Sequence, residues 1–165
     1  MMSGDLFSFS IRPAVPADAG LIATLTRTCW AGKVAASSSA HRETTEQVSA
    51  DLQNGGGFLL MHEDSAIGSV RWQALDDQPG IWEMRRMGIL PAFRASNLSA
   101  HLVNAVVAAA QASHVSELRL GVRIDQPRLL DFYSRHQFVL VTELEYAHAN
   151  PNEPKPYVMR RWLSG

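Results

Sequence analysis

The chain of 165 residues contains one cysteine, Cys29, and no apolar run long enough to span a membrane. A single cysteine excludes an intrachain disulfide and a structural zinc site built from several thiolates. The six histidines show no metal-ligand spacing, so we expect no metal. Residues 1–10 lack the basic and apolar regions of a signal peptide. These absences predict a cytoplasmic protein in a reducing compartment, with no membrane partner.

The chain also lacks an excess of charge of either sign. Fifteen basic and sixteen acidic residues give a formal net charge of -1, which predicts no nucleic-acid partner. Paired arginines such as Arg85-Arg86 are typical of a solvated strand face. The length and the hydrophobic content of 46% suit one core, so we predict a single domain over residues 1–165.

The spacing of apolar residues predicts a mixture of strands and helices. The expected strands cover residues 7–11, 58–61, 66–75, 81–90, 117–124, 138–141 and 157–159. The expected helices begin near Asp18, Thr44, Leu98 and Pro127, and Thr44 has the capping-box spacing to Gln47. A strand, a helix and a strand follow one another in residues 81–124, which predicts a parallel pair.

Two polar or glycine-rich segments interrupt this order. Residues 54–57 read NGGG, which we interpret as a turn. Residues 32–42 are small and polar, which suggests a loop over a substrate site. Gly88 lies inside an expected strand, where glycine marks either a bulge or a close approach of the backbone.

The most specific patterns lie in the second half of the chain. Residues 83–94 read EMRRMGILPAFR, and residues 125–133 read DQPRLLDFY, with Phe138 following. These segments resemble the fourth strand, the pyrophosphate loop and the helix with its tyrosine in the GNAT superfamily of acyl-CoA-dependent N-acetyltransferases. The resemblance implies an α/β (α+β mixed-sheet) domain of about seven mostly antiparallel strands, with one parallel central pair and about four helices.

The resemblance also implies binding of acetyl-CoA as the cosubstrate. Asn97 and Ser99 replace two residues of the family's loop pattern, which are glycine and then glycine or alanine. Asn97 tolerates a left-handed backbone, and Ser99 is able to cap the following helix or to donate a hydroxyl bond. The coenzyme-binding residues implied in this way are Met87, Gly88, Ile89, Arg94, Ala95, Ser96, Asn97, Leu98, Ser99 and Gln126.

Acyl transfer to an amine requires a neutral nitrogen, whereas a lysine-like amine has a pKa of about 10.4. The resemblance implies that Glu83 is the general base; an exposed strand glutamate or an ion pair with Arg71 or Arg85 is the alternative. Gly88 and Ile89 lie where the family has a strand bulge that frees a backbone N–H for the thioester oxygen. Tyr133 is the implied acid for the departing thiolate, with a half-buried packing residue as the alternative.

The resemblance implies an acetyl-CoA-dependent N-acetyltransferase, an enzyme that acts directly on a primary amine of a small molecule or peptide. The alternative is a non-catalytic module that uses the coenzyme cleft for ligand sensing or protein interaction. Trp30 and Glu145 are the expected acceptor contacts, and a solvated carboxylate is the alternative for Glu145. The sequence does not choose among amino acids, polyamines, aminoglycosides and protein termini, nor between a monomer and a homodimer.

Overall fold

A computed structural model describes residues 8–31, 43–146 and 152–163 of the protein, so the expected substrate loop at 32–42 lies outside the described residues. Seven strands form one sheet in the order β1-β2-β3-β4-β5-β7-β6. Only β4 and β5 pair in parallel among the described strands. The strands are β1 (Phe9–Pro13), β2 (Gly55–His62), β3 (Ser65–Leu75), β4 (Gln78–Ile89), β5 (Glu117–Val122), β6 (Val139–Val141) and β7 (Tyr157–Trp162).

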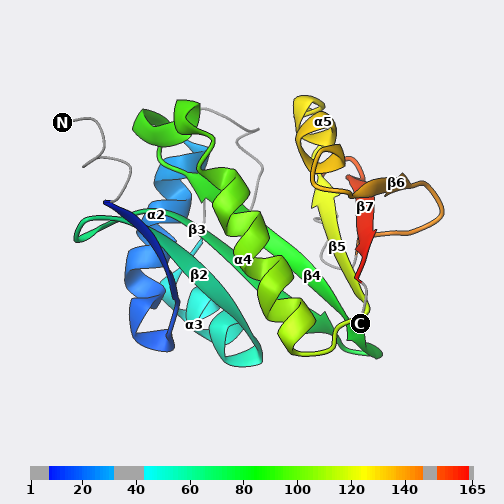
Figure 1. The fold of residues 1–165 in the computed structure, drawn as a ribbon, viewed down its shortest axis with the longest axis horizontal. Helices are drawn as coiled ribbons and strands as arrows, with labels where there is room; N and C mark the ends of the chain where they lie inside the picture. Colours follow the sequence, from blue (N-terminus) through cyan, green and yellow to red (C-terminus); the bar gives the residue numbers. More distant parts are fainter. Residues whose placement is uncertain (1–7, 32–42, 147–151, 164–165) are drawn as a thin grey trace.

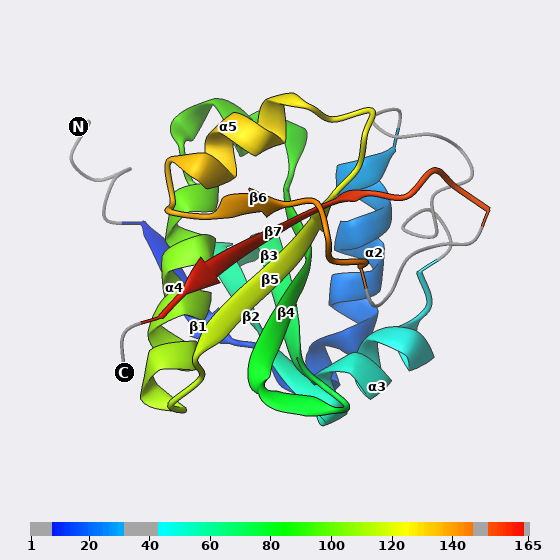
Figure 2. The same ribbon diagram turned by 90° about the vertical axis from the view of Figure 1, so that its right-hand side faces the viewer.

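Four α-helices accompany the sheet, which confirms the predicted fold class. They are α2 (Ala19–Trp30), α3 (Thr45–Asn54), α4 (Ser99–Ala112) and α5 (Arg128–Ser134). α4 lies on one face of the sheet, and α2 and α3 lie on the other (Figures 1 and 2). No helix in the described ranges is long and apolar enough to cross a membrane.

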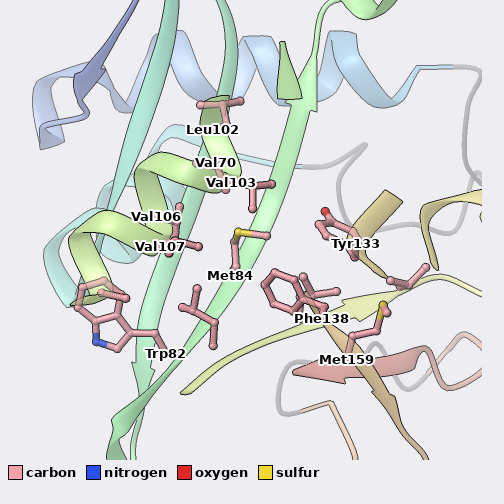
Figure 3. Packing of buried hydrophobic residues seen from close by; sticks show 14 of the residues in the cluster. Val70, Trp82, Met84, Leu102, Val103, Val106, Val107, Tyr133, Phe138 and Met159 are labelled. Carbon is pink, nitrogen blue, oxygen red and sulfur yellow. The ribbon is translucent and has the colours of Figure 1, made fainter. Parts of the chain in front are cut away.

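Each face of the sheet has its own core because apolar side chains alternate along the strands. Buried Trp82 and Met84 of β4 pack with Val103 and Val106 of α4 in the larger core (Figure 3). The smaller core joins α2 and α3 to β2. On the α2 and α3 face, β4 therefore carries the intervening residues, Glu83 among them.

The glycine run at residues 55–57 begins β2, so the interpretation of residues 54–57 as a turn is wrong. The three glycines pair with Gln73, Trp72 and Arg71 of β3. A Cβ at Gly55 would lie 2.0 Å from the Trp72 carbonyl oxygen, and one at Gly56 would lie 2.4 Å from the Trp72 ring. The absence of side chains lets β2 run closely over Trp72, which itself stacks on Trp82.

The helix before this run begins where the sequence predicts. The Gln47 N–H donates to Thr44 Oγ1 at 3.2 Å, and the Thr44 N–H donates to Gln47 Oε1 at 2.9 Å. Two N–H groups at the helix start are thus satisfied by side chains. The capping box is confirmed, and it fixes the start of α3.

The parallel pair holds together at one end only. Residues 81–83 of β4 are in register with residues 117–119 of β5, and beyond them the two strands diverge (Figure 1). The main sheet β1-β2-β3-β4 therefore meets the smaller β5-β7-β6 part along a short seam. The diverging ends of β4 and β5 leave their inner edges unpaired.

Candidate active site

A cavity of about 520 Å³ lies between β4 and β5 where the strands part. Residues 84–89 and 120–123 form its two long walls, and residues from the end of α2, the start of α4 and the region of α5 close it. This volume is within the usual range for sites that hold a small molecule or a cofactor.

The β4 wall of the cavity contains a bulge. Ser69 pairs with Gly88 and Arg71 pairs with Arg85, so Val70 of β3 faces both Arg86 and Met87. Arg86 has a φ of 55°, which is the left-handed region and is uncommon for a residue other than glycine. The bulge expected at Gly88 and Ile89 therefore lies at Arg86 and Met87. The bulge lies two residues earlier than expected because Arg86, and not Gly88, adopts the left-handed backbone conformation.

Gly88 has a different reason to be glycine. A Cβ there would lie 2.5 Å from Cζ3 of Trp30 and 3.1 Å from Cβ of Cys29. The close approach of α2, the second alternative for this position, is what the structure contains. Met87, Gly88, Ile89 and Trp30 all line the cavity.

The predicted pyrophosphate loop is a 3₁₀ turn, Pro91–Ser96, followed by Asn97. Asn97 is exposed and has a φ of 56°, so the left-handed backbone foreseen for it is present. α4 begins at Ser99 with Leu98 in the N-cap position and no side-chain cap, which makes the cap prediction for Ser99 wrong. Ser99 lines the cavity, whereas Leu98 is buried in the core.

Arg94 joins three parts of the wall. Its Nε donates to the Ile89 carbonyl at 2.9 Å, and its NH2 group donates to the Cys29 carbonyl. The guanidinium therefore ties the end of α2 to the end of β4 while it lines the cavity. Ala95 and Ser96 belong to the same turn, and their side chains are outside the described part of the structure.

Tyr133 reaches the cavity from α5, opposite β4. Its ring packs on Phe132 and Phe138 with centroid distances of 5.0 and 5.7 Å. Burial, and then the nearby Tyr146, raise the pKa of its hydroxyl well above the usual value. The hydroxyl is therefore protonated throughout the physiological range, as an acid for a thiolate must be. Gln126 lines the same part of the cavity.

Glu83 is buried, with 2% of its surface exposed, so the alternative of an exposed strand glutamate is wrong. Its neighbours in register are Gln73 on β3 and Arg119 on β5. Glu83 is not among the residues that line the cavity. It lies one residue before the β4 wall begins, at the closed end of the parted strands.

Tyr146 lines the cavity and was not identified from the sequence. Its ring lies over Gly121, where a Cβ would be 2.9 Å from the ring carbon Cδ1. Burial, and then the charge of Glu83, raise the pKa of Tyr146 to about 12, and Arg85 hydrogen-bonds to its hydroxyl. Tyr146 belongs to no local sequence pattern, and its contact with Gly121 is not visible in the sequence.

The charged groups that line the described wall of the cavity are all cationic: Arg85, Arg86, Arg94, Arg123 and Arg128. Arg85 and Arg86 have only 16% and 18% of their side chains exposed. The interpretation of this pair as a solvated strand face is therefore wrong. The bulge explains the difference, because it turns two successive side chains toward the same face of β4.

Glu145, the other expected acceptor contact, lies outside the cavity. Its carboxylate pairs with Lys155 at 2.6 Å, with 77% of the side chain exposed. The hydrogen bond from Lys155 lowers the pKa of this exposed carboxyl. The solvated alternative for Glu145 is the one that the structure contains.

The Acetyltransferase (GNAT) family model matches residues 22–138, which is more than half of the chain. The chain belongs to the GNAT acetyltransferase family. Among curated proteins, no match is found. The matched residues of this GNAT chain include β4, its bulge, α4 and Tyr133.

Solved structures have the same fold as this GNAT chain at low sequence identity. A GNAT-family acetyltransferase from Streptococcus pneumoniae is 22% identical, with 94% of this chain and 99% of that chain covered and a TM-score of 0.74. The ribosomal-protein-S18-alanine N-acetyltransferase from Escherichia coli is 12% identical, with 95% of each chain covered and a TM-score of 0.74. The PaiA N-acetyltransferase from Thermoplasma acidophilum, solved in complex with coenzyme A, is 14% identical, with 94% and 99% covered and a TM-score of 0.73.

The family implies coenzyme A binding, and the residues of the cavity fit it. The N-terminus of α4 has no side-chain cap, so its first N–H groups are available to an anion such as a pyrophosphate. Arg128 lies beside the cavity as a cation. The parted strands also expose backbone groups that a pantetheine amide is able to pair with.

Proposed function

We propose that the protein transfers an acetyl group from acetyl-CoA directly to a primary amine of a small molecule or peptide. The observation that carries this proposal is the cavity between the parted strands. The β4 bulge forms one wall of the cavity, and Tyr133 reaches it from the other side. A bulge donor and a protonated hydroxyl on opposite walls are the two groups that acyl transfer from a thioester needs.

Acetyl-CoA, when bound, supplies an acetyl thioester to this cavity. In the proposed arrangement the start of α4 and the turn Pro91–Ser96 hold the phosphates, and β4 and β5 hold the pantetheine arm. A backbone N–H in the bulge at Arg86 and Met87 faces the thioester oxygen as negative charge develops on it. The backbone of the bulge is held from behind by the contact of Arg86 with Glu43.

The amine nitrogen attacks the carbonyl carbon, a C–N bond forms and the C–S bond breaks. Tyr133 gives its proton to the leaving sulfur, and the amine loses one proton to a base. Glu83 is the proposed base, but because it does not line the cavity it must act through intervening groups. Tyr146 is suited to such a relay, since a neutral hydroxyl both accepts and donates a proton.

The proposal is tested by incubating the protein with acetyl-CoA and a panel of amines while free thiol is measured. Tyr133→Phe removes only the hydroxyl, so we expect kcat to fall by about 10²-fold with acetyl-CoA binding nearly unchanged. Calorimetry with CoA measures the binding separately. An unchanged kcat would remove Tyr133 from the acid role.

The same assays separate enzyme from non-catalytic module. Amine-dependent release of thiol supports the enzyme. Tight binding of acetyl-CoA without transfer to any amine on the panel would support a module that only senses or presents the coenzyme. The absence of any binding at millimolar acetyl-CoA would contradict both.

A further inference from the structure

We propose that Phe9 and His62 are positioning residues for the coenzyme: through the ring of Phe93 they hold the turn Pro91–Ser96 that binds its phosphates. The inference rests on the proposed function, which assigns the phosphates to this turn and to the start of α4. It concerns residues outside the cavity, because neither Phe9 nor His62 lines it.

Phe9 of β1, His62 of β2 and Phe93 of the turn form an aromatic cluster. Phe9 and His62 are partners in the strand register, and their ring centroids are 4.7 Å apart. The Phe93 ring lies 5.4 Å from the His62 ring and meets the Phe9 ring edge to face at 6.2 Å. All three distances are within the range over which aromatic rings attract one another. The paired strands β1 and β2 therefore offer Phe93 a fixed surface.

Phe93 and Arg94 are successive residues, and they tie the turn to two different parts of the protein. Arg94 donates to the carbonyl groups of Cys29 and Ile89, which lie at the ends of α2 and β4. The Phe93 ring reaches the other way, to the first two strands. The Phe93 N–H donates to the Leu90 carbonyl at 2.9 Å, so its backbone is part of the turn itself. The ring cluster thus supplies a second attachment for the turn.

The shape of this turn matters because backbone N–H groups must bind the phosphates. α4 begins without a side-chain cap, and Asn97 before it has a φ of 56°. Such N–H groups bind an anion best when they already point at its site, since little ordering is then required on binding. The pantetheine arm, by contrast, lies between β4 and β5 in the proposed arrangement. Loss of the ring cluster should therefore weaken the phosphate contacts and leave the contacts of the arm intact.

The test compares acetyl-CoA with S-acetylpantetheine, which has the same thioester and arm without any phosphate. In His62→Ala we expect KM for acetyl-CoA to rise about 3- to 10-fold, as loss of one or two ring contacts predicts. Both kcat with acetyl-CoA and kcat/KM for S-acetylpantetheine should stay within about twofold of the wild type. His62→Phe keeps a ring at this position, so its KM for acetyl-CoA should also stay within about twofold.

Phe58→Ala is the matched control. Phe58 is another half-buried aromatic residue of β2 and packs against the larger core, but it lies at the opposite end of the pairing with β1. Its loss should lower stability without a selective rise in KM for acetyl-CoA. Four results would overturn the inference and leave the proposed function intact: unchanged kinetics in His62→Ala, equal losses with both thioesters, failure of His62→Phe to keep the low KM, or the same selective rise in Phe58→Ala.

If no amine is acetylated, the proposed function fails, and two measurements without turnover decide the inference. Calorimetry should give a Kd for CoA that is about 3- to 10-fold higher in His62→Ala than in the wild type. In the free protein, amide hydrogen exchange in residues 92–98 should be faster in His62→Ala but not in Phe58→Ala. Unchanged exchange would overturn the inference even if CoA does not bind. If His62→Ala does not fold, Phe9→Leu must show the same effects.

Discussion

At the scale of single residues, Gly88 shows how one missing side chain shapes the site. Its Cα faces the Trp30 ring so closely that a Cβ would lie 2.5 Å from Cζ3. Both residues line the cavity, so the position of the ring sets the width of the site at the α2 end. The backbone of Gly88 is not in the left-handed region, so this packing is the reason for the glycine.

We therefore predict that Gly88→Ala displaces Trp30 and costs about 1–3 kcal/mol of unfolding free energy, as overpacking in a core does. The displaced ring should narrow the cavity and raise KM for acetyl-CoA or for the acceptor. Urea unfolding and steady-state kinetics measure the two effects. Gly80→Ala is the control, because the nearest atom to its Cβ would be Ser116 Oγ at 3.7 Å. If Gly88→Ala has the same unfolding free energy as the wild type, the Trp30 ring moves aside without an energetic cost, and the prediction is wrong.

Some residues of the site were predictable from the sequence and others were not. Tyr133, Arg94 and Gly88 belong to local patterns, and the structure brings them to one cavity. Tyr146 belongs to no pattern, because it reaches the cavity through a packing contact with distant Gly121. Glu43 is equally hidden, since its partners Arg71 and Arg86 come from strands later in the chain.

At the scale of elements, the sequence predicted β3 and α4 well because their apolar spacing is regular. It failed at residues 55–57, where the pairing of β2 with Trp72 overrides the turn tendency of glycine. It also predicted the β4 bulge at Gly88 instead of at Arg86 and Met87. Residue 88 is glycine because α2 packs closely against it, and not because the strand is bulged there. Tertiary contacts decided both positions.

The buried ion group explains why these elements hold one arrangement. Arg71 of β3 contacts Asp51 of α3, Glu43 before α3 and Thr26 of α2. Breaking such a pair leaves a buried charge without compensation, which typically costs 3–5 kcal/mol. The group therefore fixes α2 and α3 against this face of the sheet.

The loop that precedes α4 allows a prediction at this scale. Asn97 is held at a φ of 56°, where glycine has no steric cost, and it stands where the family pattern has glycine. If its side chain hinders the approach of a pyrophosphate, Asn97→Gly should raise CoA affinity about tenfold, or roughly 1.4 kcal/mol. Calorimetry with CoA and dephospho-CoA measures this change.

His114→Gly is the matched control for Asn97→Gly, because His114 has a φ of 59° at the other end of α4. It relieves the same backbone strain away from the cavity, so CoA affinity should stay constant. A loss of affinity in Asn97→Gly would mean that Asn97 itself bonds a phosphate. No change with either ligand would show that residues 94–99 are not the pyrophosphate loop.

At the scale of the whole molecule, the order of strands and helices was predictable, whereas the parting of β4 and β5 was not. A strand, a helix and a strand in succession predict a parallel pair in any sheet of this kind. The length of the pairing is a matter of tertiary packing, in which Tyr133 of α5 and Met159 of β7 share one buried core with Met84 of β4. Neither the spacing of apolar residues nor the turn signals in the sequence predict how many residues of β4 and β5 pair.

The backbone pairing between β4 and β5 is short, so a ligand in the cavity would add contacts across this junction. Only residues 81–83 pair with residues 117–119, while β3 and β4 pair along most of their length. A ligand that contacts both walls of the cavity adds contacts between the two parts of the sheet that are missing when the cavity is empty. Its binding free energy then opposes the separation of the two parts, and this amounts to about 2.7 kcal/mol at a ligand concentration of 100 Kd.

We therefore predict that CoA at 100 Kd slows amide hydrogen exchange in residues 117–122 and 157–162 by up to about 100-fold. Residues 9–13 and 55–62 lie in the main part of the sheet, and their exchange should change much less. Mass spectrometry of peptic fragments measures both regions in one experiment. Adenosine 3′,5′-bisphosphate is the control ligand: it carries phosphates without a pantetheine arm, so it should not bridge the walls. Equal protection of β1, β2, β5 and β7 by CoA would mean that the sheet opens as one unit and that the seam is not a weak junction.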